Sequence, residues 1–162
     1  MQAKVGIVMG SKSDLPIMQR AADVLKMMDI PYEIRVMSAH RTPHVTQAWA
    51  EAAQENGLQV LICGAGMAAH LAGVVAAHTN IPVIGVPVNA SLGGMDSLLA
   101  TVQMPPGVPV ATVGIGGAGA KNAAWLAVRI LALGDAEVRQ RLAAEKQKMR
   151  DKVIADDQSL AR

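Results

Sequence analysis

Residues 4–14, KVGIVMGSKSD, join a short hydrophobic run to a cluster of small polar residues. A second hydrophobic run, from Tyr32 to Met37, leads in the same way into Ser38-Ala39-His40-Arg41-Thr42-Pro43. In open parallel α/β sheets, ligands bind beyond the carboxyl ends of the strands, where loops lead into helix N-termini. The two clusters therefore predict a phosphate site beside a histidine that can transfer protons.

Five hydrophobic runs with β-branched residues precede helix-like segments. They are Lys4 to Met9, Tyr32 to Met37, Gln59 to Cys63, Pro82 to Val86 and Pro109 to Ile115. Strands that alternate with helices form βαβ units, and right-handed crossovers between them give a doubly wound parallel sheet. We therefore expect a three-layer α/β fold, flavodoxin-like or Rossmann-like, with about five parallel strands.

Two helical segments make further predictions. In the first, Ser13 is expected as the N-cap and Pro16 in the first turn. The apolar face of that helix is made of Met18, Ala21, Leu25 and Met28. The segment from Met67 to about His78 has no polar side, which predicts a helix buried all round, at a subunit contact near the site.

The length of 162 residues fits a single domain, with a core at 4–133 and an amphipathic C-terminal helix at about 135–155. One stripe of that helix carries Val138, Leu142, Met149 and Val153. The helix can lie on its own subunit by this stripe or dock onto a neighbouring subunit, and both arrangements remain open. Residues 156–162 are expected to be frayed.

The composition indicates an assembly of subunits. The chain is 51% hydrophobic and 17% charged, whereas an average soluble domain has about 25% charged residues. A single chain would expose much apolar surface, so a homo-oligomer is expected. A net charge of +2 and only three aromatic residues argue against nucleic-acid binding.

Other features of the sequence bear on the cellular compartment and on membrane association. Cys63 is the only cysteine, and residues 1–30 show no signal-peptide pattern, so an intracellular, cytoplasmic protein is expected. Every long apolar stretch is interrupted well before the roughly 18 residues that a bilayer span requires. No membrane association is expected.

Two glycine-rich stretches fit the dinucleotide-binding pattern, at Gly64 to Ala69 and at Gly114 to Gly119. Neither is followed at the expected place by the acidic residue that would bind a ribose, so NAD and FAD are not expected. No glycine run ends in Gly-Lys-Ser/Thr, which excludes a P-loop. No set of ligands with metal-site spacing is found, and we expect no metal.

The phosphate site is predicted from two turns. Ser11, Ser13 and the free N–H groups of the first helix can bind a phosphate monoester, and Asp14 can accept hydrogen bonds from ribose hydroxyls. The same residues could simply form an N-cap with an acidic first turn. Ser38 and Arg41 favour the phosphate site, because a second strand end brings a hydroxyl and a guanidinium to the same crevice.

The four histidines differ in their surroundings. His40 lies between phosphate ligands on a loop, where its imidazole suits acid and base roles at neutral pH. His70 follows the Gly64 turn and could be a structural hydrogen-bond donor or a ligand contact. His78 is expected at a helix C-terminus and His44 on the surface. Cys63, within a strand, is expected to be a small core residue.

Five segments together resemble the N5-carboxyaminoimidazole ribonucleotide mutase family (class I) of purine biosynthesis, also called the catalytic subunit of phosphoribosylaminoimidazole carboxylase. They are residues 9–14, 38–43, 64–71, 95–105 and 119–124, and the resemblance extends over residues 4–133. It implies an isomerase that moves a carboxylate from the exocyclic nitrogen of an imidazole ribonucleotide to the adjacent ring carbon, without a cofactor. It also implies a homo-octamer.

The resemblance also assigns roles to individual residues. His40 would be the general acid and base. The substrate contacts would be Gly10, Ser11, Ser13, Asp14, Ser38, Ala39, Arg41, Gly64, Ala65, Gly66, Ala68, His70 and Leu71. Among these, Gly64 to Leu71 would form the small pocket that retains CO2. Met67, Ala72 and Pro106 depart from the residues that are usual in the family.

Two alternatives to the mutase remain open. A related branch carboxylates aminoimidazole ribonucleotide directly from CO2, but Arg41 and residues 64–71 resemble the mutase branch. A non-catalytic flavodoxin-like module could use the same phosphate turn to bind a nucleotide. Such a module would have no need for an imidazole between phosphate ligands.

Overall fold

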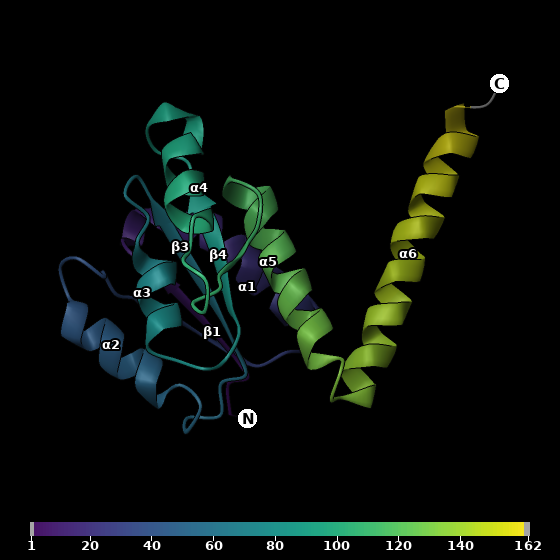
Figure 1. The fold of residues 1–162 in the computed structure, drawn as a ribbon. Helices are drawn as coiled ribbons and strands as arrows, with labels where there is room; N and C mark the ends of the chain where they lie inside the picture. Colours follow the sequence, from purple (N-terminus) through teal and green to yellow (C-terminus); the bar gives the residue numbers. More distant parts are fainter. Residues whose placement is uncertain (1, 161–162) are drawn as a thin grey trace.

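The computed structural model describes residues 2–160, and it forms an all-parallel sheet between layers of helices (Figure 1). The strands are β1 (Val5–Met9), β2 (Tyr32–Val36), β3 (Val60–Gly66), β4 (Val83–Val88) and β5 (Ala111–Thr112). Their order in the sheet is β2-β1-β3-β4-β5, and every neighbouring pair is parallel. The expected three-layer, doubly wound α/β class is therefore confirmed.

The helices cover both faces of the sheet. They are α1 (Leu15–Met27), α2 (Pro43–Ala52), α3 (Leu71–Ala77), α4 (Met95–Val102), α5 (Gly116–Leu131) and α6 (Ala136–Leu160), with short 3-10 turns η1 (Lys12–Asp14) and η2 (Leu92–Gly94). Side chains of α1 and α5 form one buried cluster with the sheet, and side chains of α2 and α3 form another. Odd-numbered residues of β1 enter the first cluster and Val8 enters the second, as the alternation along a strand requires.

The first helix follows the expectation for its apolar face but not for its cap. Met18, Ala21, Leu25 and Met28 are all buried, and Pro16 lies in the first turn. The expected cap at Ser13 is wrong, because Ser11 caps the 3-10 turn η1 that precedes the α-helix. The 3-10 turn η1 thus connects β1 to α1.

Two strands differ in length from the expectation. β3 continues past Cys63 to Gly66, because β4 pairs with it through Gly66 and Val88. The Gly64 stretch is therefore the end of a strand and not the loop after one. β5 is only two residues long, since Pro109 has no N–H to donate and Gly116 turns the chain at a φ of +74°.

The expected helix from Met67 to His78 begins only at Leu71 and ends at Ala77. Met67 has a φ of +56°, which interrupts any helix there. The helix is also not buried all round in the single chain: Leu71, Ala72 and Val75 are buried, whereas Ala77 is exposed. An interface on its outer face remains a prediction.

The C-terminal helix α6 extends away from the body of the molecule (Figure 1). Its base is fixed by buried Val138 and by the side chain of Arg141, whose Nε donates to the Met28 carbonyl oxygen at 3.1 Å. Further along the stripe, Met149 and Val153 are 47% and 68% exposed, so this outer part of the stripe does not dock on its own subunit. The helix continues to Leu160 where fraying was expected from 156, and residues 161–162 lie outside the described chain.

Candidate functional site

A cavity of about 520 Å³ opens at the carboxyl ends of β1, β2 and β3. It is lined by Gly10, Ser11, Ser13, Asp14, Ser38, Ala39, His40, Arg41, Ala65, Gly66, Met67, Ala68, His70, Leu71 and Ala90. This is the edge at which parallel α/β sheets bind ligands. The two polar clusters that lie 27 positions apart, measured from Ser11 to Ser38, thus reach one cavity.

The turn after β1 is organised by a capping box. The Ser11 hydroxyl accepts a hydrogen bond from the Ser13 N–H at 3.3 Å and another from the Ser13 hydroxyl at 2.8 Å. The Asp14 carboxylate accepts from the Ser11 N–H at 3.2 Å. Burial raises the pKa of Asp14, although hydrogen bonds from Ser11 and Ser13 and the charge of Arg41 oppose this. The turn therefore presents two hydroxyls and a partly desolvated carboxyl group to the cavity.

The turn after β2 lies directly against the first. The Ser38 hydroxyl accepts from the Arg41 N–H at 3.1 Å, and the Arg41 guanidinium donates to the Gly10 carbonyl oxygen at 3.1 Å. One hydrogen bond holds the guanidinium at the first turn and leaves its other N–H groups for a ligand. Two hydroxyl-bearing turns and one cation suit a phosphate monoester.

His40 and His70 meet inside this cavity. The Nε2 atom of His40 lies 2.8 Å from the Nδ1 atom of His70, and the rings are nearly perpendicular, at 83°. His40 comes from the loop after β2, whereas His70 is the N-cap residue of α3. His70 is thus placed beside His40, whose imidazole is expected to transfer protons.

The end of β3 supplies the apolar wall of the cavity. Ala65, Gly66, Ala68 and Leu71 line it, as expected, whereas Gly64 does not. A Cβ on Gly64 would come within 2.3 Å of the Met18 sulfur, so this glycine is needed for core packing behind the wall. Its assignment as a substrate contact stays a prediction.

Two lining residues were absent from the expected set. Met67 belongs to the glycine-rich stretch from Gly64 to Ala69. Its position directly after a strand end could have marked it as a lining residue. Ala90 lies between Asn89 and Ser91 in the segment after β4, from which no site residue was expected. Only the pairing of β4 with β3 brings Ala90 to the cavity.

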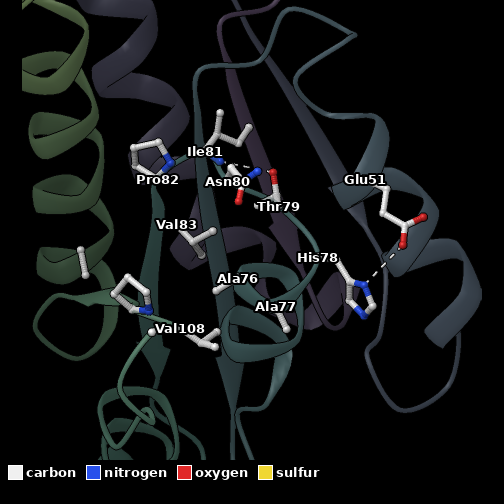
Figure 2. A pocket seen from close by; sticks show the side chains of 13 residues that line it. Glu51, Ala76, Ala77, His78, Thr79, Asn80, Ile81, Pro82, Val83 and Val108 are labelled. Atoms are coloured by element: carbon white, nitrogen blue, oxygen red, sulfur yellow. Dashed lines mark hydrogen bonds and ion pairs between the residues drawn. The ribbon is translucent and has the colours of Figure 1, made fainter.

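A second, larger cavity of about 740 Å³ lies at the opposite edge, by the amino end of β4 (Figure 2). Figure 2 shows Glu51 of α2 facing His78, whose Nδ1 atom lies 3.4 Å from a Glu51 carboxylate oxygen. His78 is the C-cap residue of α3, as expected, and His44 is exposed. The other labelled side chains are mainly small or apolar, and we assign no chemistry to this cavity.

Cys63 is buried in β3, and burial raises the pKa of its thiol, so the expected core role fits. Within residues 2–160, no group of three His, Cys, Asp or Glu side chains is placed to hold a metal ion. Over the same residues, no helix has the length and apolar character that a membrane span needs.

Hydroxyl-rich turns, an arginine and a histidine pair at the carboxyl edge of a doubly wound sheet are typical of α/β enzymes that act on phosphorylated small molecules. Comparison with known sequences defines the group more narrowly. The sequence model of the AIR carboxylase family matches residues 4–152. The chain therefore belongs to the AIR carboxylase family, and the resemblance found in its motifs is confirmed.

Several curated relatives share one name. N5-carboxyaminoimidazole ribonucleotide mutase of Pyrococcus abyssi is 56% identical over 148 residues, covering 91% of this chain and 84% of the relative. The protein of that name from Escherichia coli is 54% identical, covering 94% of this chain and 90% of the relative. The crystal structure of Treponema denticola PurE superposes with a TM-score of 0.87 at 34% identity, covering 98% of each chain.

Proposed function

We propose that this protein is an N5-carboxyaminoimidazole ribonucleotide mutase of purine biosynthesis. It would convert N5-carboxyaminoimidazole ribonucleotide to 4-carboxy-5-aminoimidazole ribonucleotide. The name shared by its curated relatives supports the reaction. The observation on which the proposal depends is that His40, with His70 as its partner, lies in the same cavity as the phosphate-type turns.

Binding of the nucleotide is assigned to the two turns. Ser11, Ser13, Ser38 and Arg41 bind the 5′-phosphate, and Asp14 accepts hydrogen bonds from the ribose. The contact between the Arg41 guanidinium and the Gly10 carbonyl supports this assignment, because it holds the cation between the two turns. Gly10 and Ala39 leave the cavity open to the sugar phosphate, since neither carries a large side chain.

His40 is assigned the proton transfers. In the first step the carbamate N–C bond breaks to release CO2, and His40 donates a proton to the exocyclic nitrogen. In the second step the adjacent ring carbon forms a bond to CO2 and gives its proton to His40. The histidine therefore ends the cycle protonated as it began, and no cofactor is consumed.

The CO2 released in the first step is assigned to the wall formed by the end of β3. Ala65, Gly66, Ala68 and Leu71 present small or apolar surfaces beside His70. Neutral CO2 offers little charge for an enzyme to bind, so retention depends on shape and on exclusion of water. His70 contributes the only polar side chain of this wall among residues 64–71.

The assembly is assigned as a homo-oligomer, an octamer by family resemblance. Exposed apolar side chains on the projecting helix α6 support it, as Val153 and Leu160 are 68% and 81% exposed. Docking of this 25-residue helix on a neighbouring subunit would remove these apolar side chains from water. We also assign the protein to the cytoplasm and expect no nucleic-acid partner.

Two assays test this function. Purified protein is mixed with the carbamate nucleotide, and absorbance is followed with and without added bicarbonate. A mutase forms product without bicarbonate, whereas a carboxylase requires bicarbonate with aminoimidazole ribonucleotide as substrate.

The second assay separates the enzyme from a nucleotide-binding module. His40→Asn should keep nucleotide affinity within about tenfold and lose about 100- to 10,000-fold in turnover. Full turnover by this variant would refute the role of His40, and absence of conversion by the wild type would refute the function.

A further inference from the structure

Met67 has a backbone conformation that no helix end explains. Its φ of +56° lies in the left-handed region, which is unfavourable for a residue with a Cβ. Asp29 also has a positive φ, of +53°, but it terminates α1, and aspartate tolerates this conformation. Met67 instead lies directly after β3, in the wall of the active-site cavity.

The conformation of Met67 starts the reversal that brings His70 to His40. Two tight turns follow it, in which the Ala69 N–H donates to the Met67 carbonyl at 2.9 Å and the His70 N–H donates to the Ala68 carbonyl at 2.8 Å. Unfavourable backbone conformations persist where the surrounding structure fixes them, and they cluster at functional sites. The position of Met67 is therefore fixed relative to the histidine pair.

The side chain of Met67 is available to cover a ligand. It is 60% exposed although it lines the same cavity as His40 and His70. Methionine is unbranched and flexible, and its sulfur makes favourable contacts with aromatic rings. An imidazole ring bound in the cavity would give this side chain an apolar surface to pack against.

We propose that Met67 is a positioning residue that folds over the mouth of the cavity and retains CO2 during the reaction. This inference rests on the proposed mutase function. Once the carbamate N–C bond has broken, CO2 either bonds to the ring carbon or escapes. A side chain over the mouth favours the first outcome without touching the reacting atoms.

The test follows the carboxylate with an isotope. The carbamate nucleotide carries ¹³C in its carboxylate, the buffer contains unlabelled bicarbonate, and mass spectrometry measures the label kept in the product. Loss without enzyme is subtracted. Wild-type protein should keep most of the label, whereas Met67→Gly and Met67→Ala should lose it several-fold more often.

Two comparisons separate covering from a backbone effect. Met67→Ala removes the side chain and keeps the need for a positive φ, whereas Met67→Gly also relieves the backbone. Leu92→Gly is the matched control, because Leu92 is 79% exposed with a φ of +46° and does not line the cavity. It should keep the label as the wild type does.

The results decide whether the Met67 side chain covers the cavity. If both Met67 variants retain as much label as the wild type, the covering role is overturned while the mutase function stands. If only Met67→Gly loses label, the backbone is responsible and the covering role is again overturned. If the wild type does not convert the carbamate nucleotide at all, the proposed function and this inference fail together.

Discussion

The Nε2 atom of His40 lies 2.8 Å from the Nδ1 atom of His70. When both imidazoles are neutral, one of these nitrogens donates and the other accepts, so the tautomer of one ring sets that of the other. The remaining ring nitrogen of His40 then has a defined capacity to donate or accept toward a ligand. His70 is therefore expected to orient the proton carrier.

His70→Asn is expected to lower kcat by about 10- to 100-fold, because a small displacement of a catalytic group costs this much. KM should change little, since the phosphate turns are separate from His70. Steady-state kinetics of the purified variant provide the measurement. A variant with wild-type kcat would show that the contact has no part in turnover.

Arg41→Ala is expected to act mainly on substrate binding. A hydrogen bond to a charged group contributes about 1.5 to 3 kcal/mol, so KM should rise about 10- to 150-fold. Arg35→Ala is the control, because Arg35 is an exposed arginine of β2 whose partner, at 3.9 Å, is Glu33. Equal KM values for Arg41→Ala and Arg35→Ala would place the phosphate elsewhere.

Asp14→Asn is expected to stabilise the folded protein at pH 7 while weakening nucleotide binding. Burial raises the pKa of Asp14, so between the ordinary carboxyl pKa and the raised value the folded state binds more protons than the unfolded state. Stability contributed by this group therefore falls as the pH rises through that interval. Asparagine keeps an acceptor for the Ser11 N–H and carries no charge.

Thermal unfolding at several pH values measures this effect. The stability advantage of Asp14→Asn should be present at pH 7 and vanish as the pH falls to about 3.9, the ordinary value for aspartate. Asp23→Asn, on the exposed side of α1, serves as the control. A destabilised Asp14→Asn at pH 7 would mean that Arg41 and the capping box outweigh the cost of burial.

Val153→Glu is expected to weaken the assembly, because it places a carboxylate in the exposed apolar stripe of α6. Sedimentation should show the wild type as a species larger than a single chain and the variant as smaller species. Ala155→Glu adds the same charge elsewhere on the helix and should leave the assembly intact. Sedimentation of the wild type as a single chain would contradict the assembly itself.

The sheet and the polar half of the site could be predicted from local sequence. Hydrophobic runs that end in small polar residues mark strand ends, and parallel strands bring those ends to one edge. For this reason the Ser11 and Ser38 turns were expected in one crevice, and both line the same cavity. The strand pattern alone was enough to predict this.

The features that local sequence did not predict depend on contacts through space. The short β5 and the late start of α3 follow from backbone conformations at Gly116 and Met67, which hydrophobic patterns do not encode. The packing of Met18 against Gly64 and the approach of Ala90 both require the folded sheet. The contact between His40 and His70, which are 30 positions apart, also requires the folded sheet.

The central claim is that His40 carries the proton to and from the nucleotide. A crystal structure with bound 4-carboxy-5-aminoimidazole ribonucleotide tests it most directly, by the distance from the His40 ring nitrogens to the carboxylated ring carbon. We expect a nitrogen within about 3.5 Å of that carbon, with the phosphate at Ser11, Ser38 and Arg41. A His40 ring turned into solvent, away from the bound heterocycle, would contradict the claim.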